Sequence, residues 1–286
     1  MIKKGIWPLI IIASFMIFSQ NVLGWITTRL TWSGGPSLKP VMAVDSSKNY
    51  YVFYADETPG NYEIFFKKST DSGTTWTTRR LTWNAGTSQG VDVTIDTDDN
   101  IHLVWMDTTP RNFEIFYKNS TDGGSTWSTK QVSMTPDTSM MPAVVTDLNK
   151  NIHVFWHDNS PGNNEIFYAM STDSGTTWAT KRLTWNPGIS QVPEITAGFK
   201  NIIHVVWSDN TPVDSEVYYK WSADGGASWT TERLTWNTGN SNWPFVLTHT
   251  TDLVLPTHIS IIPAFIVHVL WDDSSPGNVE IFHKYK

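Results

Sequence analysis

Residues 69–76 read Ser-Thr-Asp-Ser-Gly-Thr-Thr-Trp, and the same Ser-x-Asp-x-Gly-x-x-Trp pattern returns at 120–127, 171–178 and 222–229. Successive copies stand 51 residues apart, and the sequence between them is also repeated. A repeat of this length, made of several short alternating runs, is typical of the blades of a β-propeller. The repeat therefore predicts an all-β protein built from successive four-stranded units.

One repeat shows how the four strands of a unit are predicted. The strand signals lie at Pro142–Asp147, His153–Asp158, Glu165–Ser171 and Ala179–Trp185. Each run is rich in Val, Ile, Phe, Tyr, Trp or Thr, and turn residues such as Gly, Pro, Asn and Asp bound it. The repeated motif falls between the third and fourth strands, so it predicts the turn that joins them.

The two ends of the repeated region predict how the propeller closes. The segment Trp25–Trp32 aligns with Trp76–Trp83, which is a fourth strand, and Glu280–Lys286 aligns with a third strand. Together with the complete repeats, these pieces give five strands of each kind. We therefore predict one domain, residues 25–286, that forms a five-bladed propeller of four-stranded antiparallel blades. The N-terminal strand is expected to pair in the last blade, which would leave no exposed sheet edge.

The first 24 residues differ from the repeats. Lys3 and Lys4 precede an apolar run over residues 5–18, and a polar tail ends at Gly24. This order is typical of a signal peptide, so we predict a secreted or surface-exposed protein without membrane insertion after cleavage. The apolar run is shorter than the about 20 residues of a membrane span. An uncleaved N-terminal anchor is the alternative.

Composition excludes several classes of function. The net charge is −7 and only 16% of residues are charged, so the chain lacks the basic surface that nucleic acids require. There is no cysteine, which rules out disulfides, thiolate metal ligands and thiol nucleophiles. No cofactor or metal site is predicted. Trp occurs 16 times, and so many indoles indicate an architectural role.

The repeated motif resembles the Asp box of the sialidase-like (BNR-repeat) propellers, and the resemblance extends repeat by repeat over residues 25–286. Its physics is structural: the carboxylate accepts N–H groups across the turn, the glycine adopts positive φ, and the indole packs between blades. The residues assigned to these roles are Asp71, Asp122, Asp173, Asp224, Gly73, Gly124, Gly175, Gly226, Trp76, Trp127, Trp178 and Trp229.

Sialidase activity, which the resemblance would imply, needs three arginines that grip one substrate carboxylate. Arg29, Arg80, Arg182 and Arg233 occupy one column of the repeat, which places them on separate blades. Only Arg111 lies in a different loop. Because a bidentate grip needs converging guanidinium groups, we expect no catalytic residue of the sialidase type and regard the chain as a non-catalytic relative.

A divergent glycoside hydrolase is the alternative, and it needs two carboxyl groups in different environments. Most acidic residues fall in repeated columns. Asp92 and Glu194 do not, and both follow the start of a first strand, which lines the channel of a propeller. They form the best non-repeated pair, although they belong to different blades.

The leading hypothesis is a binding or scaffold protein that recognises a glycan or an extracellular protein through the loop face opposite the Asp boxes. An Asp ends the second strand of every blade (Asp56, Asp107, Asp158, Asp209 and Asp273), and in four blades a Trp precedes it by two residues (Trp105, Trp156, Trp207 and Trp271). Such a ring suits multivalent binding, with carboxylates accepting sugar hydroxyls. One alternative is structural: each Asp accepts hydrogen bonds from the turn that follows its own strand, and each Trp packs in the core. Another is that the ring of aspartates binds a hard cation.

The last repeat carries thirteen extra residues around Thr248–Phe265, which predicts a longer hairpin or a flap. A purely structural exported domain is the third hypothesis for function, and the sequence leaves the oligomeric state open.

Overall fold

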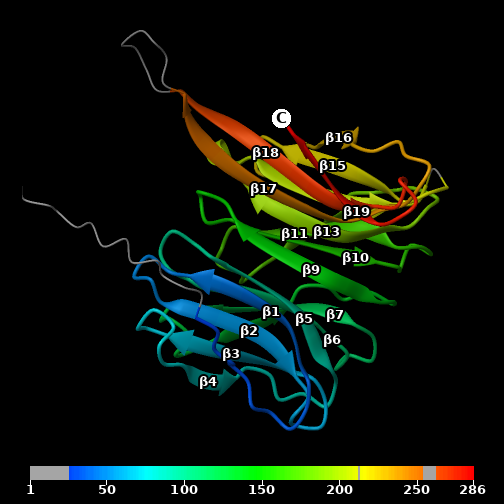
Figure 1. Cartoon of the computed structure of the whole chain (residues 1–286). Coiled ribbons are helices and arrows are strands. Elements are labelled where there is room, and N and C mark those ends of the chain that lie inside the picture. Colours follow the sequence, from blue (N-terminus) through cyan, green and yellow to red (C-terminus); the bar gives the residue numbers. More distant parts are fainter. Residues whose placement is uncertain (1–25, 212, 254–261) are drawn as a thin grey trace, which may run out of the picture. The chain divides into compact units, whose positions relative to one another are not determined.

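The computed structural model describes residues 26–211, 213–253 and 262–286, and it divides into two compact units, Met1–Trp32 and Ser33–Lys286 (Figure 1). The signal peptide predicted at 1–24 lies outside the described residues. In the first unit, residues 26–32 form no strand. Over the described ranges, no helix has the length and apolar character needed to span a membrane.

The second unit holds all the strands that the structure describes. The first blade contains β1 (Ser37–Val44), β2 (Tyr50–Asp56), β3 (Glu63–Ser69) and β4 (Thr77–Arg80). The second contains β5 (Ser88–Ile95), β6 (Ile101–Asp107), β7 (Glu114–Ser120) and β8 (Ser128–Gln131). The third contains β9 (Ser139–Thr146), β10 (Ile152–Asp158), β11 (Glu165–Ser171) and β12 (Ala179–Arg182). The fourth contains β13 (Ser190–Ala197), the 3₁₀ turn η1 (Phe199–Asn201), β14 (Ile203–Asp209), β15 (Glu216–Ser222) and β16 (Thr230–Arg233). The fifth contains β17 (Ser241–Leu253), β18 (Ile262–Asp273) and β19 (Glu280–Tyr285).

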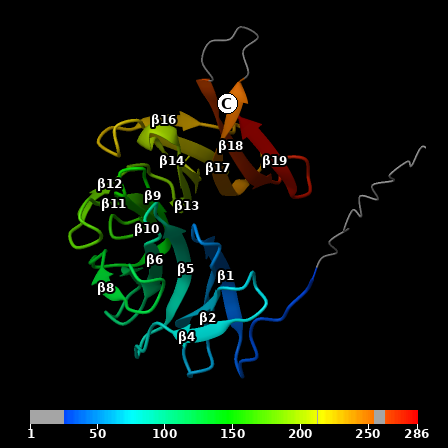
Figure 2. The same cartoon turned by 90° about the vertical axis from the view of Figure 1, so that its left-hand side faces the viewer.

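Each blade is an antiparallel sheet in which strands follow one another in chain order. The first strands contact in succession, β1 with β5, β5 with β9, β9 with β13 and β13 with β17. Within Ser33–Lys286, Figure 2 shows the blades following one another around a common centre. The predicted all-β, five-bladed propeller is confirmed.

The predicted closure by an N-terminal strand is not formed. The sheet β17–β18–β19 has three strands, and residues 26–32 carry none. In the other blades a short turn delivers the fourth strand beside the third, as β4 follows β3 after residues 70–76. The segment 26–32 has no such turn to β19, because almost the whole chain separates them. Among the described residues, β19 therefore has no fourth strand beside it.

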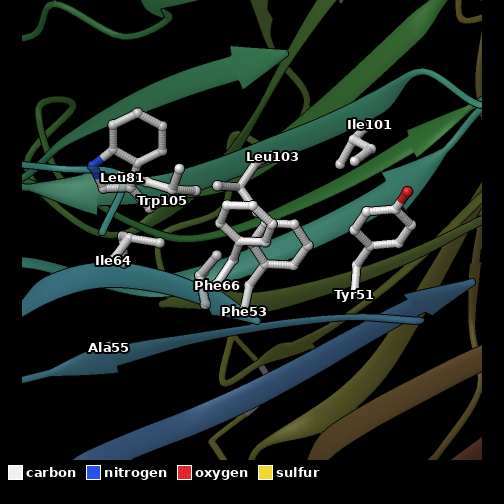
Figure 3. Close-up of a cluster of buried hydrophobic side chains, with 10 residues drawn as sticks. Tyr51, Phe53, Ala55, Ile64, Phe66, Leu81, Ile101, Leu103 and Trp105 are labelled. Carbon is white, nitrogen blue, oxygen red and sulfur yellow. The ribbon is translucent and has the colours of Figure 1, made fainter. Parts of the chain in front are cut away.

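The core lies between neighbouring blades, because the second strands are buried on both faces. Every residue of β6, β10 and β14 is buried. In Figure 3, Phe53 and Phe66 of the first blade lie against Leu103 of the second, and Tyr51 lies beside Ile101. Equivalent clusters join each later pair of blades. Fully burying one such side chain contributes about 1.5–3 kcal/mol, so the interfaces between blades stabilise the fold.

The turn between the third and fourth strands has the hydrogen bonds expected from the sequence. Asp71 accepts the backbone N–H of Thr75 (2.8 Å) and the hydroxyl of Ser69 (2.8 Å). The indole Nε1–H of Trp76 donates to the carbonyl of Gly73 at 3.0 Å, and Gly73 has a φ of 84°. These bonds lower the pKa of Asp71 to about 2, with the hydroxyl and N–H of Thr75 contributing most. The turn therefore stays bonded at any ordinary pH.

The four turns are alike in their remaining residues. The boxes of Asp122, Asp173 and Asp224 repeat the hydroxyl and backbone N–H bonds of Asp71. The glycines of these boxes, Gly124, Gly175 and Gly226, also have positive φ. Their indoles pack on the preceding blade: Trp127 on Phe53 and Phe66, Trp178 on Tyr117, and Trp229 on Phe155 and Tyr168.

Two adjacent glycines of one turn provide a matched test of this packing. A Cβ on Gly226 (φ 92°) would lie 2.2 Å from the hydroxyl of Tyr168, whereas one on Gly225 (φ 64°) would meet nothing within 4 Å. Gly226→Ala is expected to lower the free energy of unfolding by roughly 2 kcal/mol, and Gly225→Ala by about 1 kcal/mol or less. Urea denaturation of both variants measures the difference, and equal losses would contradict the assignment.

The extra residues of the last repeat extend a hairpin. Strands β17 and β18 have 13 and 12 residues, against 8 and 7 for β9 and β10. Their register continues from Ser241↔Asp273 to Leu253↔Ile262. Residues 254–261, which connect them, lie outside the described part of the chain.

Candidate functional site

The aspartates that end the second strands are buried and accept hydrogen bonds from protein groups. Asp107 accepts bonds from Asn84 Nδ2 (2.6 Å), Ser88 Oγ (2.6 Å), Trp105 Nε1 (3.2 Å) and the N–H of Thr109 (2.7 Å). Burial alone would raise the pKa of Asp107, but the bonds from Ser88 and Thr109 hold it below its ordinary value. This carboxylate anchors the loops at one end of its blade.

The other members of the ring have the same surroundings. Asp56, Asp158, Asp209 and Asp273 each accept the hydroxyl of the serine that begins the first strand of the same blade, and each accepts a backbone N–H two residues on. The paired indoles are also buried: Trp105, Trp156, Trp207 and Trp271 stack on aromatic rings of β7, β11, β15 and β19. A ligand role for this ring stays a prediction, and in this geometry the protein itself uses these groups.

The repeated arginines lie on separate blades, as expected. Arg80, Arg182 and Arg233 pair with Glu63, Glu165 and Glu216 of their own blades at 2.6–2.8 Å. Each glutamate is buried, and its guanidinium partner neutralises it within the blade. These arginines do not converge on one point.

The first strands of the blades carry a feature that the sequence reading missed. Each has an irregularity in register, at a residue with positive φ: Lys39 (47°), Gly90 (63°), Met141 (52°), Val192 (54°) and Trp243 (48°). Positive φ is rare for residues other than glycine, and a β-branched residue such as Val192 is strained there. The fold therefore repeats one bulge in every blade.

A signal for these bulges was present in the sequence. The residue after the bulge is proline in four of the blades: Pro40, Pro142, Pro193 and Pro244. Proline donates no ladder hydrogen bond, so inside a strand it is found mainly at bulges and edges. Its recurrence near the start of four first strands marks the place where the ladder is interrupted.

The bulges line a central cavity of about 230 Å³, to which all five blades contribute. Its wall contains the five bulge residues and, in the first four blades, the residue that follows each of them. The next residues along the chain in these four blades also line the cavity: Val41, Asp92, Ala143 and Glu194. At the bulge position the blades present an ammonium, a glycine, a thioether, an isopropyl group and an indole. The five blades therefore present different side chains to the cavity.

The cavity holds the acid pair that the sequence singled out. Asp92 and Glu194 occupy a column that is apolar in the other blades, where Val41, Ala143 and Phe245 stand. Burial raises the pKa of Asp92 to about 6, although its carboxylate accepts the N–H of Val144 at 2.8 Å. Burial and then the negative charge of Asp92 raise the pKa of Glu194 to about 7. Near neutral pH the pair therefore retains a proton that ordinary carboxyl groups would have lost.

Comparison with known proteins gives a fold and no closer relationship. No family model matches the chain, and no curated protein sequence matches it. Among solved structures, an α-L-arabinofuranosidase of Fusarium graminearum, in complex with arabinobiose, is similar with a TM-score of 0.63 at 15% identity, covering 87% of this chain and 80% of the enzyme.

Two further structures are similar over most of their length. An intramolecular trans-sialidase from Ruminococcus gnavus has a TM-score of 0.59 at 11% identity, with 88% of this chain and 86% of that chain covered. A protein of unknown function from Dyadobacter fermentans has a TM-score of 0.58 at 14% identity, with 87% and 94% covered. The chain thus has the fold of the sialidase-like β-propellers.

Proposed function

We propose that the protein binds a glycan in its central cavity through Asp92, Glu194 and the indole of Trp243. One observation carries this proposal: the repeat loses its symmetry inside the cavity, where two carboxyl groups replace apolar residues. A structural repeat has no need of such a difference between blades. A binding site for one end of one ligand does need it.

The chemistry of the cavity suits a sugar. A carboxyl pair that keeps a proton near pH 7 offers both a donor and acceptors, and sugar hydroxyls also act as both. Trp243 has 60% of its surface exposed and offers an apolar face for the C–H groups of a ring. The volume of about 230 Å³ is below the about 300–1,000 Å³ of most ligand sites. It therefore favours a single sugar unit or the end of a chain.

Proteins of similar fold support the glycan class, because the Fusarium enzyme is complexed with arabinobiose. The proposal includes export, as the signal pattern of residues 1–24 predicts, and a position outside the cell where glycans are abundant. An extracellular protein partner for the loop face stays a prediction.

A glycoside hydrolase is the second candidate, and the unequal pKa values of Asp92 and Glu194 favour it. Hydrolysis of a glycosidic bond needs one protonated and one ionised carboxyl group. Glu194, whose pKa is raised to about 7, would be the acid, and Asp92 would be the ionised partner. Both candidates use the same residues and differ in whether a bond is broken.

One set of variants separates these two candidates. The protein is screened on a glycan array and then incubated with the glycans that it binds, and reducing ends are measured. Glu194→Gln, Asp92→Asn and Trp243→Ala are each expected to weaken binding about tenfold. If the protein is a hydrolase, Glu194→Gln lowers turnover by about a hundredfold or more.

Asp137→Asn is the control for these variants, because Asp137 is an exposed carboxylate outside the cavity. Binding without release of reducing ends supports a binding protein. The proposal fails if no glycan binds, or if the three cavity variants bind as tightly as Asp137→Asn.

A further inference from the structure

Three tryptophans project from the junctions between blades of the unit Ser33–Lys286. Trp83, Trp185 and Trp236 have 68%, 69% and 64% of their surface exposed. The sequence predicted that the fourth strand would reach Trp185, but β12 ends at Arg182, and β4 and β16 end at the equivalent arginines. The indoles therefore leave the sheet. Three junctions therefore expose an indole at the same position of the repeat.

Each of these indoles lies among cations. The guanidinium groups of Arg80, Arg182 and Arg233 lie 5.7, 5.8 and 5.6 Å from the ring centroids of Trp83, Trp185 and Trp236. At two of the junctions a lysine from the third strand of the next blade also lies beside the indole. Lys220 lies 6.0 Å from the centroid of Trp185, and Lys284 lies 5.5 Å from that of Trp236.

At the first junction the equivalent lysine reaches the same loop, since Lys118 Nζ donates to the carbonyl of Leu81 at 2.7 Å. We call each trio of Trp, Arg and Lys an indole–cation site. Each arginine also neutralises one buried glutamate. One positive charge therefore remains at each site.

The junction between the second and third blades lacks all three groups. Gln131, Met134 and Ala169 stand where the other junctions have Arg, Trp and Lys. Its backbone is the same, because Gln131 pairs with Phe116 as Arg80 pairs with Phe65.

Local bonds replace those of the missing arginine. Gln131 Nε2 donates to the carbonyl of Ser133 at 2.8 Å, and the hydroxyl of Ser133 donates to Glu114 at 2.5 Å. The fold thus forms without the trio. The backbone of a junction therefore does not depend on the trio.

We propose that the three indole–cation sites bind an acidic polysaccharide, one charged sugar unit at each site. The C–H face of a sugar ring packs on the exposed indole, and its carboxylate or sulfate group pairs with the neighbouring ammonium and guanidinium groups. Equivalent sites at three of the junctions match a polymer with repeating units. Weak single contacts then add to a tighter overall affinity.

Charge distinguishes this occupant from nucleic acid. Binding to a nucleic acid depends on several Lys or Arg side chains that neutralise neighbouring phosphates. Each indole–cation site carries only one net positive charge, and the whole protein has a net charge of −7. The sites are separate from the central cavity, because none of their residues lines it. The proposal therefore does not depend on the function proposed for the cavity.

Binding of polygalacturonate and of dextran sulfate by the purified protein tests the proposal, with neutral dextran as the reference polymer. The variant Trp83→Ala/Trp185→Ala/Trp236→Ala is expected to lose at least about tenfold in apparent affinity for one or both acidic polymers. Met134→Ala, at the junction that lacks the trio, is expected to bind as the unchanged protein does. The variant Gln131→Arg/Met134→Trp is expected to bind the acidic polymers at least about twofold more tightly than the unchanged protein, because it adds the Arg and the Trp of a fourth site.

Thermal unfolding of each variant verifies that it is folded. Carboxylated and sulfated polymers are compared at equal charge to decide which anionic group is preferred. Asp92→Asn/Glu194→Gln is expected to bind the acidic polymers normally. Equal affinity of the triple variant and the unchanged protein would overturn the proposal. So would equal affinity for neutral dextran, or a loss of acidic-polymer binding in the cavity variant alone.

Discussion

Replacing Trp156 by alanine is expected to lower the free energy of unfolding by about 4 kcal/mol. Trp156 has none of its surface exposed and stacks on Phe167, with ring centroids 5.9 Å apart. It also belongs to the cluster that joins the second and third blades, where Val104, Ile115 and Tyr117 pack. The variant loses the buried area of the indole and leaves a cavity that the rigid sheets cannot close.

Trp185→Ala is the matched control for Trp156→Ala. Both residues are tryptophans of the third blade, but Trp185 has 69% of its surface exposed. Its loss removes only cation–π contacts, which contribute about 1 kcal/mol or less at exposed sites. Guanidinium chloride denaturation compares the two variants. Similar losses of stability would contradict the assignment of Trp156 to the core and of Trp185 to a binding surface.

Replacing Glu194 by glutamine is expected to stabilise the protein above neutral pH. The pKa of Glu194 is raised from an ordinary 4.5 to about 7, chiefly by burial. Below pH 4.5 the side chain is protonated in both the folded and the unfolded state, and it carries no penalty. As the pH rises from 4.5 through 7, the unfolded state loses its proton first, so the folded state loses stability relative to it.

The size of this effect follows from the shift in pKa. The change from 4.5 to about 7 corresponds to about 3 kcal/mol, and solvent in the cavity reduces it to about 2 kcal/mol. At pH 8 we therefore expect Glu194→Gln to raise the melting temperature by roughly 4 °C, with no rise at pH 4. Asp137→Asn is expected to change it at neither pH.

Calorimetry at pH 4 and pH 8 measures the melting temperatures. A gain that is equal at both values would show that the effect does not come from ionisation. Together with the expected loss of glycan affinity, stabilisation would mark Glu194 as a residue kept for function at a cost in stability.

The sequence by itself determined the parts of the protein that depend on neighbours along the chain. The Ser-x-Asp-x-Gly-x-x-Trp turn is closed by bonds between residues a few positions apart, such as Asp71 and Thr75. Alternation of side chains within a strand is equally local. Repetition of these signals at constant spacing was therefore enough to predict five blades, the place of each turn and the roles of Gly226 and Trp229.

Only the tertiary structure decided which groups are available to a ligand. The repeated Asp107 and Trp105 had the residue types of a binding site, but their neighbours in space bury them and supply their hydrogen-bond partners. The equally repeated Trp185 leaves the sheet and is exposed, although it had been assigned to a strand. Burial depends on contacts between blades, which spacing along the chain does not encode.

The meeting of Asp92 and Glu194 in one cavity was decided in the same way. The sequence singled out both residues because they break the repeat, but they are about a hundred positions apart and belong to different blades. They share one cavity because a bulge recurs in every first strand and five such strands surround a common centre. Local physical chemistry specifies the blade, and the way in which the blades pack together creates the site.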